Sequence, residues 1–117
     1  MKEVQCIGFI PPVEGVDQEF NTFRLGGTLA KALTVGEEVF LMDEKKKRVF
    51  GRAVVLRVEV GKLRELCDEH AHSNHRELMN PPEGAGERLF TYLQKIFGPH
   101  IAPPTKKACV IYLKRME

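Results

Sequence analysis

The chain of 117 residues is poor in the features that mark secreted and membrane proteins. It has three cysteines, Cys6, Cys67 and Cys109, and no two of them form a C-x-x-C pair. An odd number of cysteines argues against a disulfide framework and is typical of a reduced compartment. No stretch approaches the roughly 20 apolar residues of a transmembrane helix. We therefore expect a cytoplasmic protein that makes no contact with a membrane.

An excess of either charge is also missing. The chain has 18 lysines and arginines and 16 aspartates and glutamates, so its net charge is +2. This balance argues against strong non-specific binding to DNA, which depends on many phosphate contacts. The chain has no G-x-x-x-x-G-K-[ST] loop, no G-x-G-x-x-G turn and no G-x-S-x-G elbow. Nucleoside triphosphate, dinucleotide and serine-hydrolase chemistries therefore have no local support.

What the chain does contain is a series of short apolar segments separated by turn residues. Alternating β-branched and aromatic residues predict strands, and they lie at 4–10, 20–25, 38–42, 48–60 and 108–113. Amphipathic patterns predict helices, and these lie at 62–75 and 83–97, with one helical turn at 28–33. Gly51 suggests a bulge in its strand. This order predicts a single α+β domain over 1–117, a small mixed or antiparallel β-barrel of about five strands with two helices on one side.

The richest group of potential metal ligands lies at the end of the first predicted helix, from Cys67 to His75. On a helix only the pairs Cys67/His70 and His72/His75, spaced i, i+3, face the same way. No second cluster completes a set of four ligands. Histidines are also favoured near a helix C-terminus by its dipole. We therefore expect neither a metal nor a cofactor.

Two groups of polar residues are candidates for ligand binding. In the strand 20–25, alternation places Thr22 and Arg24 on one face, where they can hold an anion or the edge of a base. The second group lies at a predicted hairpin tip and can follow a phosphate backbone; it consists of Lys45, Lys46, Lys47 and Arg48. The alternative interpretation of both groups is a polar surface that only contacts solvent.

The order of elements resembles the ASCH domain family, a branch of the PUA-like β-barrels, and within it the small bacterial acetylcytidine amidohydrolases. The resemblance covers about residues 15–115 and rests on Thr22-x-Arg24, the segment Thr-Val-Gly-Glu-Glu-Val at 34–39, the helix at 63–71 and the closing strand at 110–114. It implies a PUA-like barrel with a cleft, framed by helices, that binds RNA or a modified nucleoside.

The catalytic positions of that family are only partly present. The family signature G-x-K-x-x-E-x-R has Thr in place of Glu in the amidohydrolases. When this signature is aligned on Arg24, Thr22 occupies the Glu/Thr position and Glu19 occupies the lysine position. In a shifted register, Lys31 is the displaced lysine. The resemblance places Asn74 where the amidohydrolases carry a glutamate. Glu19 reverses the charge of the lysine, and Asn74 cannot take up a proton near neutral pH.

The resemblance and the departures from it lead to three hypotheses. The first is a non-catalytic module that binds RNA or a nucleoside-like ligand through Arg24, Thr22 and Asn74. The second is an amidohydrolase acting on acetylated cytidine, or a nuclease, with Thr22 as nucleophile and a rearranged base; the candidate bases are Glu19, His70 and His72. The third is a protein-interaction barrel whose cleft holds no nucleic acid.

Overall fold

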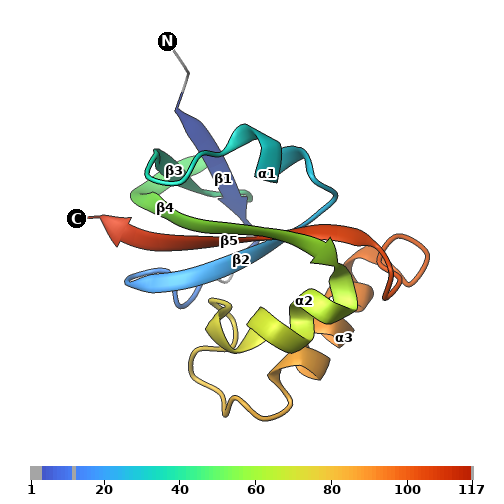
Figure 1. Ribbon diagram of the computed structural model, residues 1–117. Coiled ribbons are helices and arrows are strands. Elements are labelled where there is room, and N and C mark those ends of the chain that lie inside the picture. The colour runs from blue at the N-terminus through green and yellow to red at the C-terminus, as the bar shows by residue number, and fades with distance from the viewer. Residues whose placement is uncertain (1–3, 12, 117) are drawn as a thin grey trace.

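The computed structural model describes residues 4–11 and 13–116, and its centre is one mixed sheet curled into a half-barrel (Figure 1). The sheet order is β1-β3-β4-β5-β2. β1 pairs with β3 in parallel, and the other neighbours are antiparallel. The strands are β1 (Gln5–Phe9), β2 (Glu19–Leu25), β3 (Glu38–Asp43), β4 (Arg48–Lys62) and β5 (Lys107–Met116). The predicted fold class and the five predicted strands are confirmed.

The long strand β4 bends at two irregularities. Leu41 pairs with Gly51 but Met42 pairs with Val49, so Phe50 is an extra residue beside the glycine. This confirms the predicted bulge, and a side chain at Gly51 would begin only 2.4 Å from a guanidinium nitrogen of Arg115. A second register shift follows Val55. Because bulges bend and twist a strand, they explain how β4 curves the sheet.

Helices cover both faces of the sheet (Figure 1). The short helix α1 (Thr28–Ala32) lies on one side, and α2 (Leu63–His70) and α3 (Ala85–Phe97) lie on the other. A 3-10 turn, η1 (Ala71–Ser73), follows α2. No helix in the described part of the chain is long and apolar enough to cross a membrane.

The prediction of one helix over 62–75 is wrong at its C-terminal end. After η1 the backbone of Asn74 is extended and forms an isolated parallel bridge with Asn21 of the edge strand β2. The His75 N–H donates to the Asn21 carbonyl at 3.2 Å. The chain leaves the helix because this pairing covers backbone groups at the sheet edge that would otherwise lack partners.

Two separate apolar clusters hold the layers together. One lies under α1 and includes Phe9, Phe20 and Ile111. The other lies between the sheet and the pair α2–α3 and includes Leu63, Leu89 and Val110. Ile111 and Val110 are successive residues of β5, and alternation sends them to opposite faces. This strand therefore contributes to both clusters.

Candidate functional site

A cleft of about 400 Å³ lies where the two edge strands, β1 and β2, approach each other. This volume falls within the range of small-molecule sites. Its walls come from the end of β1, from β2, from the β3–β4 turn, from the loop after η1 and from α3. The residues that line it include Phe9, Thr22, Arg24, Glu44, His75, Arg76 and Tyr92. Asn74 also lines it, so the fold brings together all three residues of the first hypothesis.

Arg24 connects the two edge strands across this cleft. Its Nη1 donates to Thr22 Oγ1 at 2.6 Å and to the Phe23 carbonyl at 2.8 Å, and its Nη2 donates to the Gly8 carbonyl of β1. The guanidinium also lies over the ring of Phe9, 5.4 Å from its centre. Burial lowers the pKa of Arg24, although arginine stays protonated in proteins. Among residues 4–11 and 13–116, three of its five N–H donors thus have partners and two remain for a ligand.

Thr22 is almost completely enclosed, with 1% of its surface exposed. Its Oγ1 accepts the hydrogen bond from Arg24, so its own hydroxyl hydrogen is still available as a donor. A threonine nucleophile needs a base within hydrogen-bond reach. Within the described residues, no histidine or carboxylate is hydrogen-bonded to Thr22. The arrangement therefore suits a hydrogen bond to a ligand better than nucleophilic attack.

His75 lines the cleft, although the sequence placed it only in the histidine cluster. The Glu14 carbonyl, 3.1 Å from Nδ1, can only accept, so Nδ1 carries the hydrogen and Nε2 keeps a lone pair. The ring stands edge-on to Phe9 and Phe20. Burial, with smaller contributions from the charges of Arg76 and Arg24, lowers the pKa of His75 to about 4, against a smaller opposing effect of the Glu14 hydrogen bond. His75 is therefore neutral near pH 7 and a weak base.

Asn74 uses its side chain to hold the loop. The amide oxygen accepts the N–H of Arg76 at 3.0 Å, and the amide nitrogen donates to the Asn21 carbonyl at 3.4 Å. Only 3% of the residue is exposed. These contacts place His75 and Arg76 at the cleft, so much of the hydrogen-bonding capacity predicted for a ligand serves the loop.

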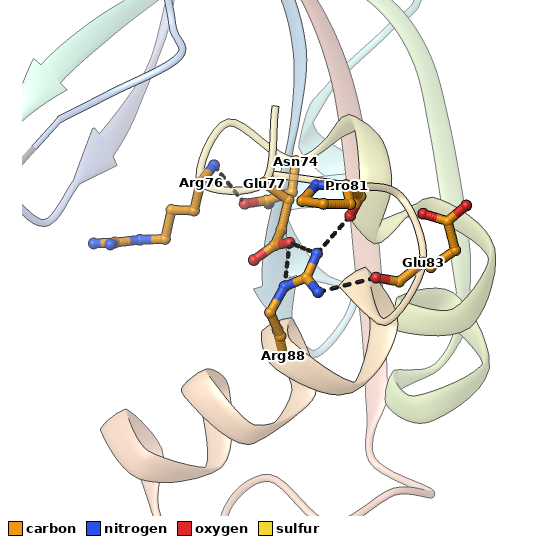
Figure 2. A network of polar contacts seen from close by, with 6 residues as sticks. All are labelled: Asn74, Arg76, Glu77, Pro81, Glu83 and Arg88. Carbon is orange, nitrogen blue, oxygen red and sulfur yellow. Dashed lines mark hydrogen bonds and ion pairs between the residues drawn. The ribbon is translucent and has the colours of Figure 1, made fainter. Parts of the chain in front are cut away.

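An ion pair anchors the same loop to α3 (Figure 2). Glu77 Oε1 accepts from Arg88 Nε at 2.9 Å and from Arg88 Nη2 at 2.7 Å. Arg88 also donates to the carbonyls of Pro81, at 2.6 Å, and Glu83, at 2.9 Å. In Figure 2 the side chain of Arg76 points away from this network. The pair therefore fixes the backbone of the loop and leaves Arg76 for other contacts.

The bases predicted for the hydrolase alternative lie elsewhere. Glu19 begins β2, opposite Lys114, in a separate surface hollow. It is five residues from Arg24, a strand distance of roughly 17 Å. His70 is buried, with its Nδ1 2.7 Å from the hydroxyl of Tyr112, and neither His70 nor His72 lines the cleft. The reason is that α2 packs against the face of β5, away from the edge where the cleft opens.

The shifted register, in which Lys31 is the displaced lysine, is not supported by the position of this residue either. Lys31 lies exposed on α1, outside the residues that line the cleft. In the part of the chain that the structure describes, no group of three or more histidine, cysteine, aspartate or glutamate side chains is arranged to hold a metal ion.

The basic hairpin tip adjoins the cleft through Glu44. This residue lines the cleft, and its side chain crosses β1 at Gly8, where a Cβ would come within 1.7 Å of Oε1. Glu44 Oε2 is paired with Lys47 Nζ at 2.7 Å. The four predicted basic residues, Lys45, Lys46, Lys47 and Arg48, are all exposed. They form a cationic tip beside the cleft rather than part of its lining.

Comparison with known proteins gives matches in structure only. No protein-family model and no curated protein matches the sequence. A DUF984 protein from Enterococcus faecalis has a TM-score of 0.57 and 8% identity, over 85% of this chain and 61% of that one. Two single-residue variants of ZmASCH from Zymomonas mobilis have TM-scores of 0.54 and 0.56. They are 13% and 12% identical, over 93% and 97% of this chain and 67% and 68% of theirs. The chain thus spans less than two thirds of the DUF984 protein, and it has an ASCH-like fold.

Proposed function

We propose that this ASCH-like module binds a nucleoside, or one nucleotide of a single-stranded RNA, in the cleft and does not hydrolyse it. The observation that carries the proposal is the state of Arg24. The protein holds three of its donors, which fixes the plane of the guanidinium, and leaves two for a ligand. A planar fork of this kind is suited to the edge of a base, which offers paired acceptors.

The remaining walls support an aromatic ligand. Tyr92, Leu93 and Ile96 of α3 form the apolar wall of the cleft, and Arg76 covers one face of the Tyr92 ring. Phe9 also lines the cleft, but it is only 2% exposed and its ring lies against Arg24. Proteins commonly bind unpaired bases by stacking them on aromatic side chains. The cleft therefore combines an apolar wall with a few polar groups, as small-molecule sites usually do.

The chemistry of the cleft argues against turnover. Proton transfer by a positioned acid or base typically contributes about 10²–10⁴ in rate, and it is most efficient when the pKa lies near the working pH. His75, with a pKa of about 4, is too weak a base for that task. Thr22 is enclosed and hydrogen-bonded to a cation, and Asn74 cannot move a proton.

The exposed hairpin tip supports a longer ligand than one nucleoside. Lys45, Lys46 and Arg48 stand beside the cleft, and cations in such a position attract the phosphates of a bound strand. The net charge of +2 keeps this attraction weak without a base in the cleft.

Amide NMR titrations with cytidine, acetylcytidine and a short single-stranded RNA test the proposal. We expect saturable shifts at Thr22, Arg24 and His75, and at least about ten-fold weaker binding by Arg24→Lys, because lysine has no planar fork. Arg52→Lys is the matched control, since Arg52 is exposed and paired with Glu38 outside the cleft.

The same samples distinguish the alternatives. Release of acetate from acetylcytidine that stops in Thr22→Ala would replace the binding proposal by the amidohydrolase. Cleavage of the RNA would replace it by the nuclease. Shifts by none of the three ligands at low salt would reject the proposal and favour the protein-interaction barrel.

A further inference from the structure

Arg76 is a cation of the cleft that pairs with no carboxylate among the residues the structure describes. In the described part of the chain its guanidinium makes one hydrogen bond, from Nη2 to the Ile10 carbonyl at 3.4 Å, and no ion pair. It lies over the ring of Tyr92, 4.3 Å from the ring centre. Stacking occupies the face of a guanidinium but not the N–H groups at its edge. Most of the Arg76 donors are therefore available to a ligand.

The charged groups around Arg76 add up to a positive cleft. Arg24 and Arg76 line it together with the carboxylate of Glu44, which pairs with Lys47 and also attracts Arg24, so the positive charges among these groups outnumber the negative one. His75 is neutral near pH 7, and the charges of both arginines contribute to that state. Two cations in one partly enclosed cleft repel each other, and an anion bound between them removes this repulsion.

The two arginines differ in how much water surrounds them. Arg24 is held inside by Thr22, Phe23 and Gly8. Arg76 lies nearer the rim, because its one hydrogen bond, to the Ile10 carbonyl, is exposed to solvent, whereas those of Arg24 are partly buried. A phosphate is strongly hydrated and costly to bury, so the rim suits it better than the interior. The base, which is largely apolar, suits the interior.

We propose that the cleft selects a phosphorylated nucleotide over a neutral nucleoside, and that Arg76 binds its phosphate while Arg24 contacts the base. This inference rests on the proposed function and specifies its ligand. The phosphate belongs either to a free mononucleotide or to the backbone of an RNA strand. Arginine is well matched to it, because the guanidinium edge forms two parallel charge-assisted hydrogen bonds with phosphate oxygens.

The test compares the affinities of cytidine, cytidine 5′-monophosphate, the dinucleotide CpC and inorganic phosphate by amide NMR titration at low salt. We expect the monophosphate to bind about ten-fold more tightly than cytidine, as a charge-assisted contact implies. Arg76→Gln should remove most of this ratio, and Arg76→Lys should restore part of it because lysine keeps the charge. Arg52→Gln, an exposed arginine outside the cleft, should leave the ratio unchanged.

Each other outcome has a separate meaning. If cytidine and its monophosphate shift the cleft amides with equal affinity, the phosphate role of Arg76 is wrong and the proposed function stands. If inorganic phosphate binds as tightly as the monophosphate, the site is a simple anion site and the nucleotide assignment is wrong. If CpC binds still more tightly than the monophosphate, and both exceed cytidine, the phosphate belongs to a strand. If CpC and the monophosphate bind alike and both exceed cytidine, a free nucleotide suffices; both results support the assignment. If no ligand shifts the cleft amides, the proposed function itself fails.

Discussion

Replacing Glu77 by alanine tests whether the loop at the cleft depends on its ion pair with Arg88. Glu77 is 7% exposed, and its Oε1 receives two charged hydrogen bonds, at 2.9 and 2.7 Å. Hydrogen bonds to charged groups contribute roughly 1.5–3 kcal/mol each when buried. Arg88, however, has 41% of its side chain exposed and can regain water. We therefore expect Glu77→Ala to lower the free energy of unfolding by about 2 kcal/mol, less than for a fully buried pair.

A double-mutant cycle with Arg88→Ala measures the pair itself. Arg88 also donates to two carbonyls, so its single substitution removes more than one contact. The coupling energy from urea unfolding followed by circular dichroism isolates the Glu77–Arg88 term, for which we expect about 1–2 kcal/mol. For the single variant Glu77→Ala the expected fall in Tm is roughly 8 °C, at about 4 °C per kcal/mol for a chain of this size.

The matched control is the ion pair of Glu38 and Arg52, in which both side chains are 50% exposed. Exposed pairs contribute about 0–1 kcal/mol, so Glu38→Ala should change stability less than Glu77→Ala. A coupling energy below about 0.5 kcal/mol for the Glu77–Arg88 pair would show that this ion pair does not hold the loop in place. Hydrogen exchange gives a second readout: the loop amides should exchange faster in Glu77→Ala while those of β5 stay protected.

Three further predictions concern His75, the glycines and the hairpin tip. Because the pKa of His75 is about 4 in the folded protein and about 6.5 in an unfolded chain, the unfolded state binds more protons between these values. Stability should therefore fall as the pH drops from about 6.5 to 4, and urea unfolding should show a weaker fall in His75→Gln. Gly15→Ala should lower the free energy of unfolding by at least about 2 kcal/mol more than Gly36→Ala, as measured by denaturant midpoints. Both glycines have positive φ, but a Cβ at Gly15 would lie 2.2 Å from the His75 carbonyl oxygen, whereas one at Gly36 would meet open space. Replacing Lys45 and Lys46 together by glutamine should make the plot of log affinity for RNA against log salt concentration less steep, by about 1 to 1.5 in slope. The control Lys62→Gln, at the far end of β4, should leave this slope unchanged.

Most of the secondary structure followed from local patterns. Alternation in the segments around Val54 and Ile111 predicted β4 and β5, and the spacing of Leu89 and Leu93 predicted α3. These patterns are reliable because burial on one face repeats with the period of the element itself. The same reasoning failed after His70, where the helical pattern continues in the sequence but the chain turns to pair with β2. A contact with a residue 53 positions away leaves no local period.

Local sequence is enough to place Thr22 and Arg24 on one face of a strand, because side chains two residues apart in a strand point the same way. The same local patterns predicted the five strands and the basic hairpin tip, and they show that the chain has neither a G-x-x-x-x-G-K-[ST] loop nor a G-x-G-x-x-G turn. The surroundings of Thr22 and Arg24, in contrast, depend on long-range packing. It placed His75 and Arg76 beside them and left Glu19 at the other end of β2. The physical reason is that the cleft forms where two edge strands, a loop and α3 meet, and long-range packing alone sets that meeting.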